Sequence, residues 1–261
     1  MAAGSPGSPV IKWCSYCQHF IEEVEPFEDF TLTHGVCAEC APRVADFSLA
    51  ERTAAHEFRL FFSALHRTAV HGSRIEASHL LEESQRLGIR PMDLMMGLLQ
   101  PLLREIGRLW ARGEITVATE HRFTALATDL VAHFRAALPA PAQGQPELAL
   151  FTAEGNYHTL GLQMAEAHCA AIGLPALIVV PGLPTGEVLD LLRRHRPQVV
   201  GFSVAMPEQM AQVRAVAEAL EHLPPLRLPI QVGGPAVRLG LELSPDPRIQ
   251  LCHDFRTLSA S

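Results

Sequence analysis

The second half of the chain alternates short apolar runs with helical patterns, and this alternation limits the possible folds more than any other feature. Strands are expected at 147–152, 176–180, 198–203 and 229–232, with a short fifth strand at 249–252. Helical patterns occupy the intervals at 158–172, 186–195 and 207–223. Strands that alternate with helices form βαβ units, so we predict a doubly wound α/β domain in which helices cover both faces of a parallel sheet.

The region before this domain has a helical pattern. Apolar residues recur at intervals of three and four in four stretches, which predicts a four-helix bundle. Pro101 lies inside the third stretch and is expected to kink it. A segment rich in proline, alanine and glutamine then reads as a linker. The chain is accordingly divided into an N-terminal segment at 1–45, a helical bundle at 46–138, a linker at 139–146 and the α/β domain at 147–261.

Four of the six cysteines form two C-x2-C pairs near the N-terminus. Cys14 and Cys17 are separated by nineteen residues from Cys37 and Cys40. Two such pairs suit a tetrahedral zinc ion that is held by four thiolates, with one pair on each side of the ion. We therefore predict a zinc-ribbon-like segment. The alternative, which the sequence leaves open, is a cluster of reduced cysteines without a metal.

Polar and small residues follow three of the predicted strands at the same edge of the sheet. His158 follows the first strand, Ser203 ends the third, and Gly233 and Gly234 follow the fourth. Ligands of doubly wound sheets bind outside the carboxyl ends of the strands. A histidine alone in a loop is usually just exposed, but this combination predicts a ligand site.

This constellation resembles the cobalamin-binding domain family over residues 147–261, which implies a flavodoxin-like fold. The matching positions are Asn156-x-His158-x-x-Gly161, Ser203 and Gly233-Gly234. The resemblance implies that His158 coordinates cobalt as the lower axial ligand, that the three glycines make room for the cofactor's tail, and that Ser203 hydrogen-bonds the buried base. The family has a carboxylate where this chain has Asn156. An amide can still orient the imidazole, and Glu154 is close enough to substitute.

A second motif lies in the helical region, where nine residues separate Trp110 from the pair Glu120-His121. This spacing resembles the four-helix modules of the CarH/LitR family of light-sensing regulators. The resemblance implies that Trp110 shields the adenosyl group of adenosylcobalamin, with Glu120 beside it. His121 then becomes the upper axial ligand of cobalt after photolysis. Because the cysteine segment is placed outside both cofactor-facing domains, loss of zinc is expected to leave the cobalamin spectrum nearly unchanged.

Composition excludes several classes of protein. The formal net charge is −7, which argues against binding nucleic acid through bulk charge, and no helix-turn-helix pattern is visible. We therefore do not expect direct DNA binding. No apolar run reaches the roughly 18 residues of a membrane helix, and the N-terminus has no apolar signal core, so a cytoplasmic location is expected.

The expected function is that of a non-enzymatic, cobalamin-dependent photoreceptor in signal transduction or transcription regulation, which acts on a partner protein or through its own oligomeric state. Two alternatives stay open. One is a corrinoid carrier for methyl transfer, and the other is a related sensor that binds haem or a bilin.

Overall fold

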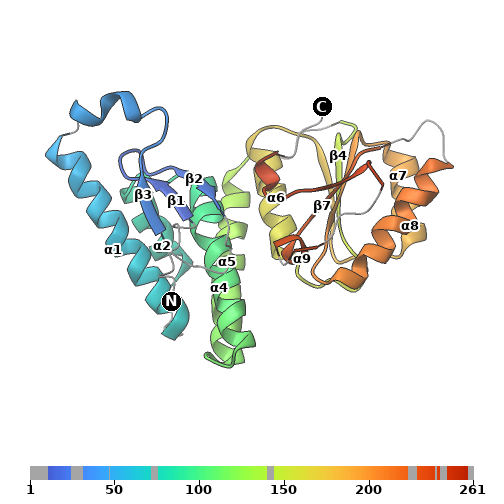
Figure 1. Cartoon of the computed structure of the whole chain (residues 1–261), viewed down its shortest axis with the longest axis horizontal. Coiled ribbons are helices and arrows are strands. Elements are labelled where there is room, and N and C mark those ends of the chain that lie inside the picture. Colours follow the sequence, from blue (N-terminus) through green and yellow to red (C-terminus); the bar gives the residue numbers. More distant parts are fainter. Residues whose placement is uncertain are drawn as a thin grey trace, which may run out of the picture. The chain divides into compact units, whose positions relative to one another are not determined.

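The computed structural model describes residues 11–24, 32–46, 48–71, 76–139, 144–222, 228–238, 240–241 and 246–257. The chain divides into two compact units, Met1–His133 and Phe134–Ser261, shown in Figure 1. The division falls within one long helix, α5. None of the helices in the described ranges is both long and apolar enough to span a membrane.

The second unit is the predicted doubly wound domain. Its elements are β4 (Leu148–Thr152), α6 (Leu160–Ala171), β5 (Ala176–Val179), α7 (Thr185–His195), β6 (Val199–Ser203), η3 (Pro207–Gln209), α8 (Met210–Glu221), β7 (Ile230–Gly233), α9 (Pro235–Arg238), β8 (Ile249–Leu251) and η4 (Phe255–Thr257). The five strands pair in the order β5-β4-β6-β7-β8, and every pair is parallel. This order is that of the flavodoxin-like fold, so the predicted fold class is confirmed.

Burial on both faces explains why the strands of this sheet are almost continuously apolar. Every residue of β4 is buried. Leu148 and Leu150 belong to a core cluster with residues of α6, whereas Ala149 and Phe151 belong to a second cluster with residues of α7 and α8. Figure 1 shows α6 on one face of the sheet and α7 and α8 on the other. A sheet that is covered on both sides requires such runs.

The first unit combines short strands with helices. Its elements are β1 (Ile11–Cys14), β2 (Phe20–Glu23), β3 (Leu32–Gly35), η1 (Ala41–Asp46), α1 (Leu49–His71), α2 (Ala77–Arg86), α3 (Pro91–Leu94), the π-turn η2 (Met95–Leu99), α4 (Gln100–Ala111) and α5 (Val117–Ala137). The central strand β1 pairs antiparallel with β2 and parallel with β3. In Figure 1 the three strands lie between α1 and α4.

The third helical stretch runs from α3 through η2 into α4, and its irregularity lies just before Pro101. In an α-helix the residue at 101 would donate to the carbonyl of Gly97, but proline has no N–H, and its ring crowds that carbonyl. The backbone widens instead, and Gln100 N–H bonds to Met95 C=O, five residues back. The kink expected at Pro101 therefore takes the form of a π-turn, one of the known causes of helix irregularity.

The cysteine segment packs into the same compact unit as the helices. Trp13 is fully buried and stacks on Phe58 of α1, with ring centroids 4.6 Å apart. Glu23 of β2 is ion-paired with Arg104 of α4. The segment therefore shares a core with the helical region. No pattern in the sequence relates Trp13 to Phe58, because the two lie 45 positions apart along the chain.

Candidate functional site

The loop between β4 and α6 carries the predicted axial histidine at the carboxyl edge of the sheet. Asn156 is 1% exposed, and its Nδ2 donates to Ser203 C=O at 2.8 Å. Its Oδ1 accepts from His158 N–H at 2.9 Å. Both ends of the Asn156 amide thus hold backbone, and the loop is fixed with His158 exposed. In this structure Asn156 positions the loop rather than the imidazole ring.

Ser203 and the double glycine meet at the same edge, where β6 and β7 end. Gly234 has φ +100°, and a Cβ there would lie 2.6 Å from Val204 C=O and 3.0 Å from Ser203 Oγ. Val204 N–H in turn donates to Gly233 C=O at 2.9 Å. Both the backbone conformation and the space therefore require glycine at 234. The close neighbour seen here is the chain itself, while a Cβ on Gly161 would meet nothing within 4 Å.

Two glutamines that the sequence analysis missed hold the loops of this edge. Gln212 of α8 is 8% exposed; its Oε1 accepts from Glu154 N–H and its Nε2 donates to Leu183 C=O, both at 2.6 Å. Gln209 Oε1 accepts from the backbone N–H groups of Ala205 and Met206. One buried amide therefore links the β4–α6 loop to the β5–α7 loop. The sequence signal that could have identified Gln212 is its position among the apolar residues on the buried face of α8.

Buried polar atoms near this edge fit a ligand that offers hydrogen-bonding groups. Thr152, at the end of β4, is fully buried, and its Oγ1 finds no partner among the described residues. Thr152 is paired in register with Ser203, which is 7% exposed. An unsatisfied buried hydroxyl is unfavourable. This orphaned oxygen, the serine beside it and the unfilled space at Gly161 suit the tail of a corrinoid at the carboxyl edge.

The second predicted motif lies at the hairpin between α4 and α5. Trp110, near the end of α4, is 50% exposed, although tryptophan is usually more buried. Glu120 and His121 occupy the first turn of α5, and the Glu120 carboxylate contacts His121 Nδ1. Glu120 also accepts from Thr124 Oγ1 at 2.8 Å. When Nδ1 donates to this carboxylate, Nε2 is the nitrogen left to bind a metal.

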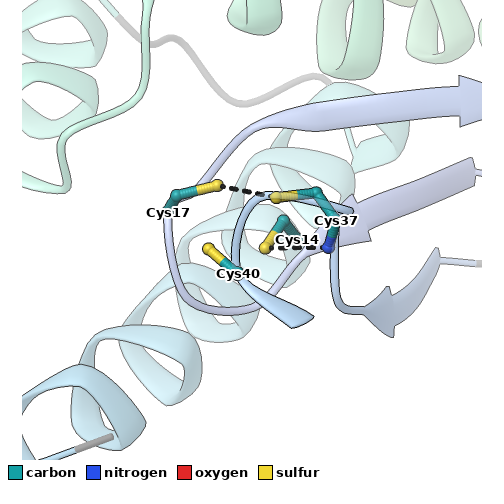
Figure 2. Close-up of side chains that lie close together, drawn as sticks. All are labelled: Cys14, Cys17, Cys37 and Cys40. Atoms are coloured by element: carbon teal, nitrogen blue, oxygen red, sulfur yellow. Dashed lines mark hydrogen bonds between the residues drawn. The ribbon is translucent and has the colours of Figure 1, made fainter. Parts of the chain in front are cut away.

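The four N-terminal cysteines converge at the ends of β1 and β3, with their sulfur atoms turned toward one another (Figure 2). Their Sγ atoms all lie within 4.8 Å of one another, and Cys17 Sγ is 3.6 Å from Cys37 Sγ. Zn–S bonds of about 2.3 Å in a tetrahedron place the sulfurs about 3.8 Å apart. The cluster therefore fits a four-thiolate metal ion such as zinc.

Hydrogen bonds and burial act in opposite directions on these thiols. Burial raises the pKa of Cys14, but backbone N–H groups of Cys17, Cys37 and Tyr16 outweigh it and lower the pKa to about 7. Burial raises the pKa of Cys40 to about 11, and it raises that of Cys17 further still. Cys14 is thus the sulfur that the backbone prepares as a thiolate, the form that binds metal.

Arg90, at the start of α3, brings positive charge toward this cluster. Its Nε donates to the buried carboxylate of Asp93 at 2.5 Å. The pKa of Arg90 is raised first by this hydrogen bond, with smaller contributions from negative charge at Cys17 and Glu39. Because zinc with four thiolates carries a net charge of about −2, a nearby guanidinium stabilises the loaded centre.

Comparison with known proteins identifies two family matches in the order seen in the sequence. Residues 62–135 match one family model described as a B12 binding domain, and residues 146–245 match another with the same description. The first match covers most of the helical part of the first unit and includes Trp110, Glu120 and His121. The second covers the loop and strand ends that hold His158, Ser203 and the double glycine. The family descriptions give no support to haem or a bilin.

Two known proteins give further likeness. The chain is 26% identical over 148 residues to the HTH-type transcriptional repressor CarH of Myxococcus xanthus. That match spans 57% of this chain and 49% of the relative, about half of its length. The structure of the monomethylamine corrinoid protein of Methanosarcina barkeri superimposes with a TM-score of 0.58 at 18% identity, over 68% of this chain and 85% of that one. This second likeness concerns the fold alone.

The two matched segments, the flavodoxin-like sheet and the likeness to CarH agree with the orphaned hydroxyl and unfilled space at the sheet edge. Two segments of the chain, one in its helical part and one in its α/β unit, match models of B12 binding domains, and these matches support a B12-binding protein.

Proposed function

We propose that the protein is a cobalamin-dependent regulator and a photoreceptor, with adenosylcobalamin as its light-absorbing cofactor. The observation that carries this proposal is the order of the two B12 binding domains, helical then α/β, together with Trp110 and Glu120-His121 in the first. Among relatives, CarH is named as a transcriptional repressor, and it shares about half of its length with this chain. When bound, adenosylcobalamin would supply a cobalt ion that histidines can hold and a light-sensitive cobalt–carbon bond.

His158 is the proposed lower ligand. The loop that carries it is held by two hydrogen bonds of the Asn156 amide and by the hydrogen bond from Glu154 N–H to Gln212. The exposed imidazole therefore extends from a fixed backbone. A ligand that is already positioned loses less conformational entropy when it binds. Gly161, Gly233 and Gly234 are proposed to admit the tail of the cofactor, and Ser203 to hydrogen-bond its base.

Trp110, Glu120 and His121 are proposed to act on the upper side. Trp110 offers a half-exposed aromatic surface that can exclude water from an alkyl group. Glu120 orients the His121 ring through Nδ1 and makes the imidazole more basic, as carboxylate partners of metal-binding histidines do. His121 is then the upper ligand that binds after photolysis.

The four-cysteine cluster is proposed to hold one structural zinc ion. The protein is proposed to signal through a partner protein or a second copy of this chain, and the binding of that partner is proposed to change with the state of the cofactor. The described residues of the first unit contain short strands and a cysteine cluster in front of the helices, and nothing in their charge favours DNA. A cytoplasmic location is part of this proposal, in keeping with the likeness to a transcriptional repressor.

Absorption spectra test this proposal directly. Purified protein is mixed with adenosylcobalamin in the dark, and spectra and hydrodynamic size are recorded before and after green light. We expect binding in the dark, a stable new spectrum after illumination, and a change in size or partner binding. His158→Ala is expected to weaken dark binding, whereas His121→Ala is expected to spare dark binding and abolish the stable lit spectrum.

His133→Ala is the matched control, because His133 is exposed on the same helix as His121 and bonds only to the Asp129 carbonyl among the described contacts. Equal binding and unchanged spectra in His158→Ala would contradict the lower-ligand assignment. A wild-type protein that ignores light but accepts and donates methyl groups would be a corrinoid carrier instead. The fold likeness to the monomethylamine corrinoid protein makes this the second candidate.

A further inference from the structure

Two aromatic side chains flank the first cysteine pair and lie against a single glycine of the π-turn η2. Trp13 directly precedes Cys14, and Phe20 follows Cys17 by three residues. A Cβ on Gly97 would lie 2.1 Å from Trp13 Cζ3 and 2.7 Å from the Phe20 ring. We call Trp13 and Phe20 the aromatic wedge. The wedge occupies space that any larger residue at 97 would fill.

Gly97 is at the centre of the π-turn, and the π-turn sets the direction of the helix beyond it. One additional residue in a helical turn rotates the following side chains by about 100° relative to an uninterrupted α-helix. The following helix is α4, which carries Trp110 near its end. The wedge therefore packs against the same continuous helical segment that carries Trp110, and a change in the π-turn would reorient Trp110.

Burial of Trp13 is partly unfavourable, so its position depends on other contacts that hold the chain beside it. The indole Nε1 is buried and finds no hydrogen-bond partner in the described part of the chain. A buried donor without a partner destabilises a structure, although stacking on Phe58 and burial of the ring offset this. The neighbouring Cys14 Sγ accepts a hydrogen bond from Cys37 N–H, and a metal ion would join it to the other three sulfurs as well. The metal would thus hold the stretch of chain that lies between the two residues of the wedge.

The start of the same helical segment also faces the cysteines. Arg90 directly precedes α3, is ion-paired with buried Asp93 and lies within electrostatic reach of Cys17. A loaded centre would therefore act on this segment at two places, through the charge of Arg90 before its first turn and through the packing of the wedge at the π-turn. Both contacts lie within the first unit.

We propose that zinc at the four-cysteine centre seats the aromatic wedge against Gly97 and thereby fixes the π-turn and the direction of Trp110. Trp13 and Phe20 are positioning residues, which act on the B12-binding helical part through the helix backbone. The inference rests on the zinc site of the proposed function and assigns it a role in arranging the surface that carries Trp110. Removal of zinc would then alter cobalamin binding, contrary to the expectation from sequence.

The two tryptophans of the chain make the test selective. In Trp110→Phe protein the emission reports Trp13 alone, and in Trp13→Ala protein it reports Trp110 alone. Zinc content is measured first, then removed with a chelator and restored with zinc. In Trp110→Phe we expect a red shift of Trp13 emission on zinc removal and its reversal on zinc return. In wild type we expect amide exchange across 95–109 to rise about tenfold or more.

Trp13→Ala tests the connection itself, because it removes the wedge and keeps all four cysteines. We expect it to bind zinc normally, to show raised exchange across 95–109, and to lose any response of that exchange and of Trp110 emission to zinc. Cys17→Ser should reproduce zinc removal. Cys252→Ser is the matched control, since Cys252 lies in the second unit outside the cluster.

The outcomes separate the inference from the proposed function. A folded protein that takes up no zinc overturns both the zinc site and the inference. A protein that binds zinc but shows unchanged Trp13 emission and helix exchange on its removal overturns the inference alone. If Cys17→Ser fails to fold, zinc removal from Trp110→Phe and Trp13→Ala still decides the question.

Discussion

Replacing Gly97 by alanine should destabilise the first unit, although alanine is the better helix former. The new Cβ would lie 2.1 Å from Trp13 Cζ3, so the indole must retreat by about 1.3 Å to reach an ordinary contact of 3.4 Å. Trp13 has no exposed surface and is stacked on Phe58, which leaves little room for that movement. Overpacking of this kind costs about 3 kcal/mol, at the upper end of the usual range.

Alanine in place of glycine within a helix contributes about 1 kcal/mol in the opposite direction. The expected net loss in the free energy of unfolding is therefore about 2 kcal/mol for Gly97→Ala. Gly107→Ala is the matched control, because Gly107 lies further along the same helical segment and a Cβ there meets nothing within 4 Å. That variant should gain up to about 1 kcal/mol, so the two variants should differ by about 3 kcal/mol.

Urea unfolding followed by tryptophan fluorescence measures this difference in the full chain. Both tryptophans lie in the first unit, so the signal is insensitive to unfolding of the second. The midpoint should fall for Gly97→Ala and rise for Gly107→Ala, with similar slopes. If the two variants have equal stability, the wedge does not occupy the space above Gly97 and the reasoning fails.

Three further predictions concern other parts of the chain. Gln212→Met should remove the hydrogen-bond partner of Glu154 N–H and Leu183 C=O. The loss of two hydrogen bonds should destabilise the second unit by about 1–3 kcal/mol and weaken cobalamin binding in a titration, while Gln163→Met on α6 should do neither. Burial lowers the pKa of His168, an effect that the charge of Asp254 opposes and that of Arg256 assists. As the pH falls, the unfolded state therefore binds a proton at this histidine before the folded state does. The free energy of unfolding thus carries the full contribution of neutral His168 above about pH 6.5 and loses it as the pH falls. Urea unfolding by circular dichroism at several pH values should show that His168→Leu reduces this loss, and an unchanged pH dependence would contradict it. Cys17→Ser should lower the zinc content below one per chain, as measured by metal analysis; retention of a full equivalent would argue against the four-thiolate site.

The fold of the second unit could be predicted because its signals are local. The central strands β4 and β6 are buried on both faces, so runs such as Leu148–Thr152 are almost entirely apolar and stand out between helical patterns. The edge that carries His158 and Ser203 then follows from the parallel order of the strands. Gln212 escaped prediction because a glutamine on a helix usually lies in solvent, and its two backbone partners belong to loops far away in the sequence.

The first unit was predicted less completely, since its decisive contacts are not local. The helices and the C-x2-C pairs were visible, and Pro101 marked an irregularity without indicating its form. The packing of Trp13 against Gly97 joins a residue of β1 to a glycine that, in sequence, only weakens a helix. The axial roles of His158 and His121 stay predictions, which the spectra described above would test.

The distance along the chain between the wedge and its seat has a consequence for biosynthesis. Gly97 follows Trp13 by 84 residues, so at roughly 5–20 residues per second the ribosome needs on the order of 4–17 s to supply the seat. Cys40 follows Cys14 by only 26 residues, and the complete ligand set emerges early. During translation the nascent chain can therefore bind a metal ion at the four cysteines well before Gly97 is available to Trp13 and Phe20. The closed metal site would restrict the conformations of this segment and so reduce the number of incorrect contacts that the two aromatic side chains can make while they are exposed.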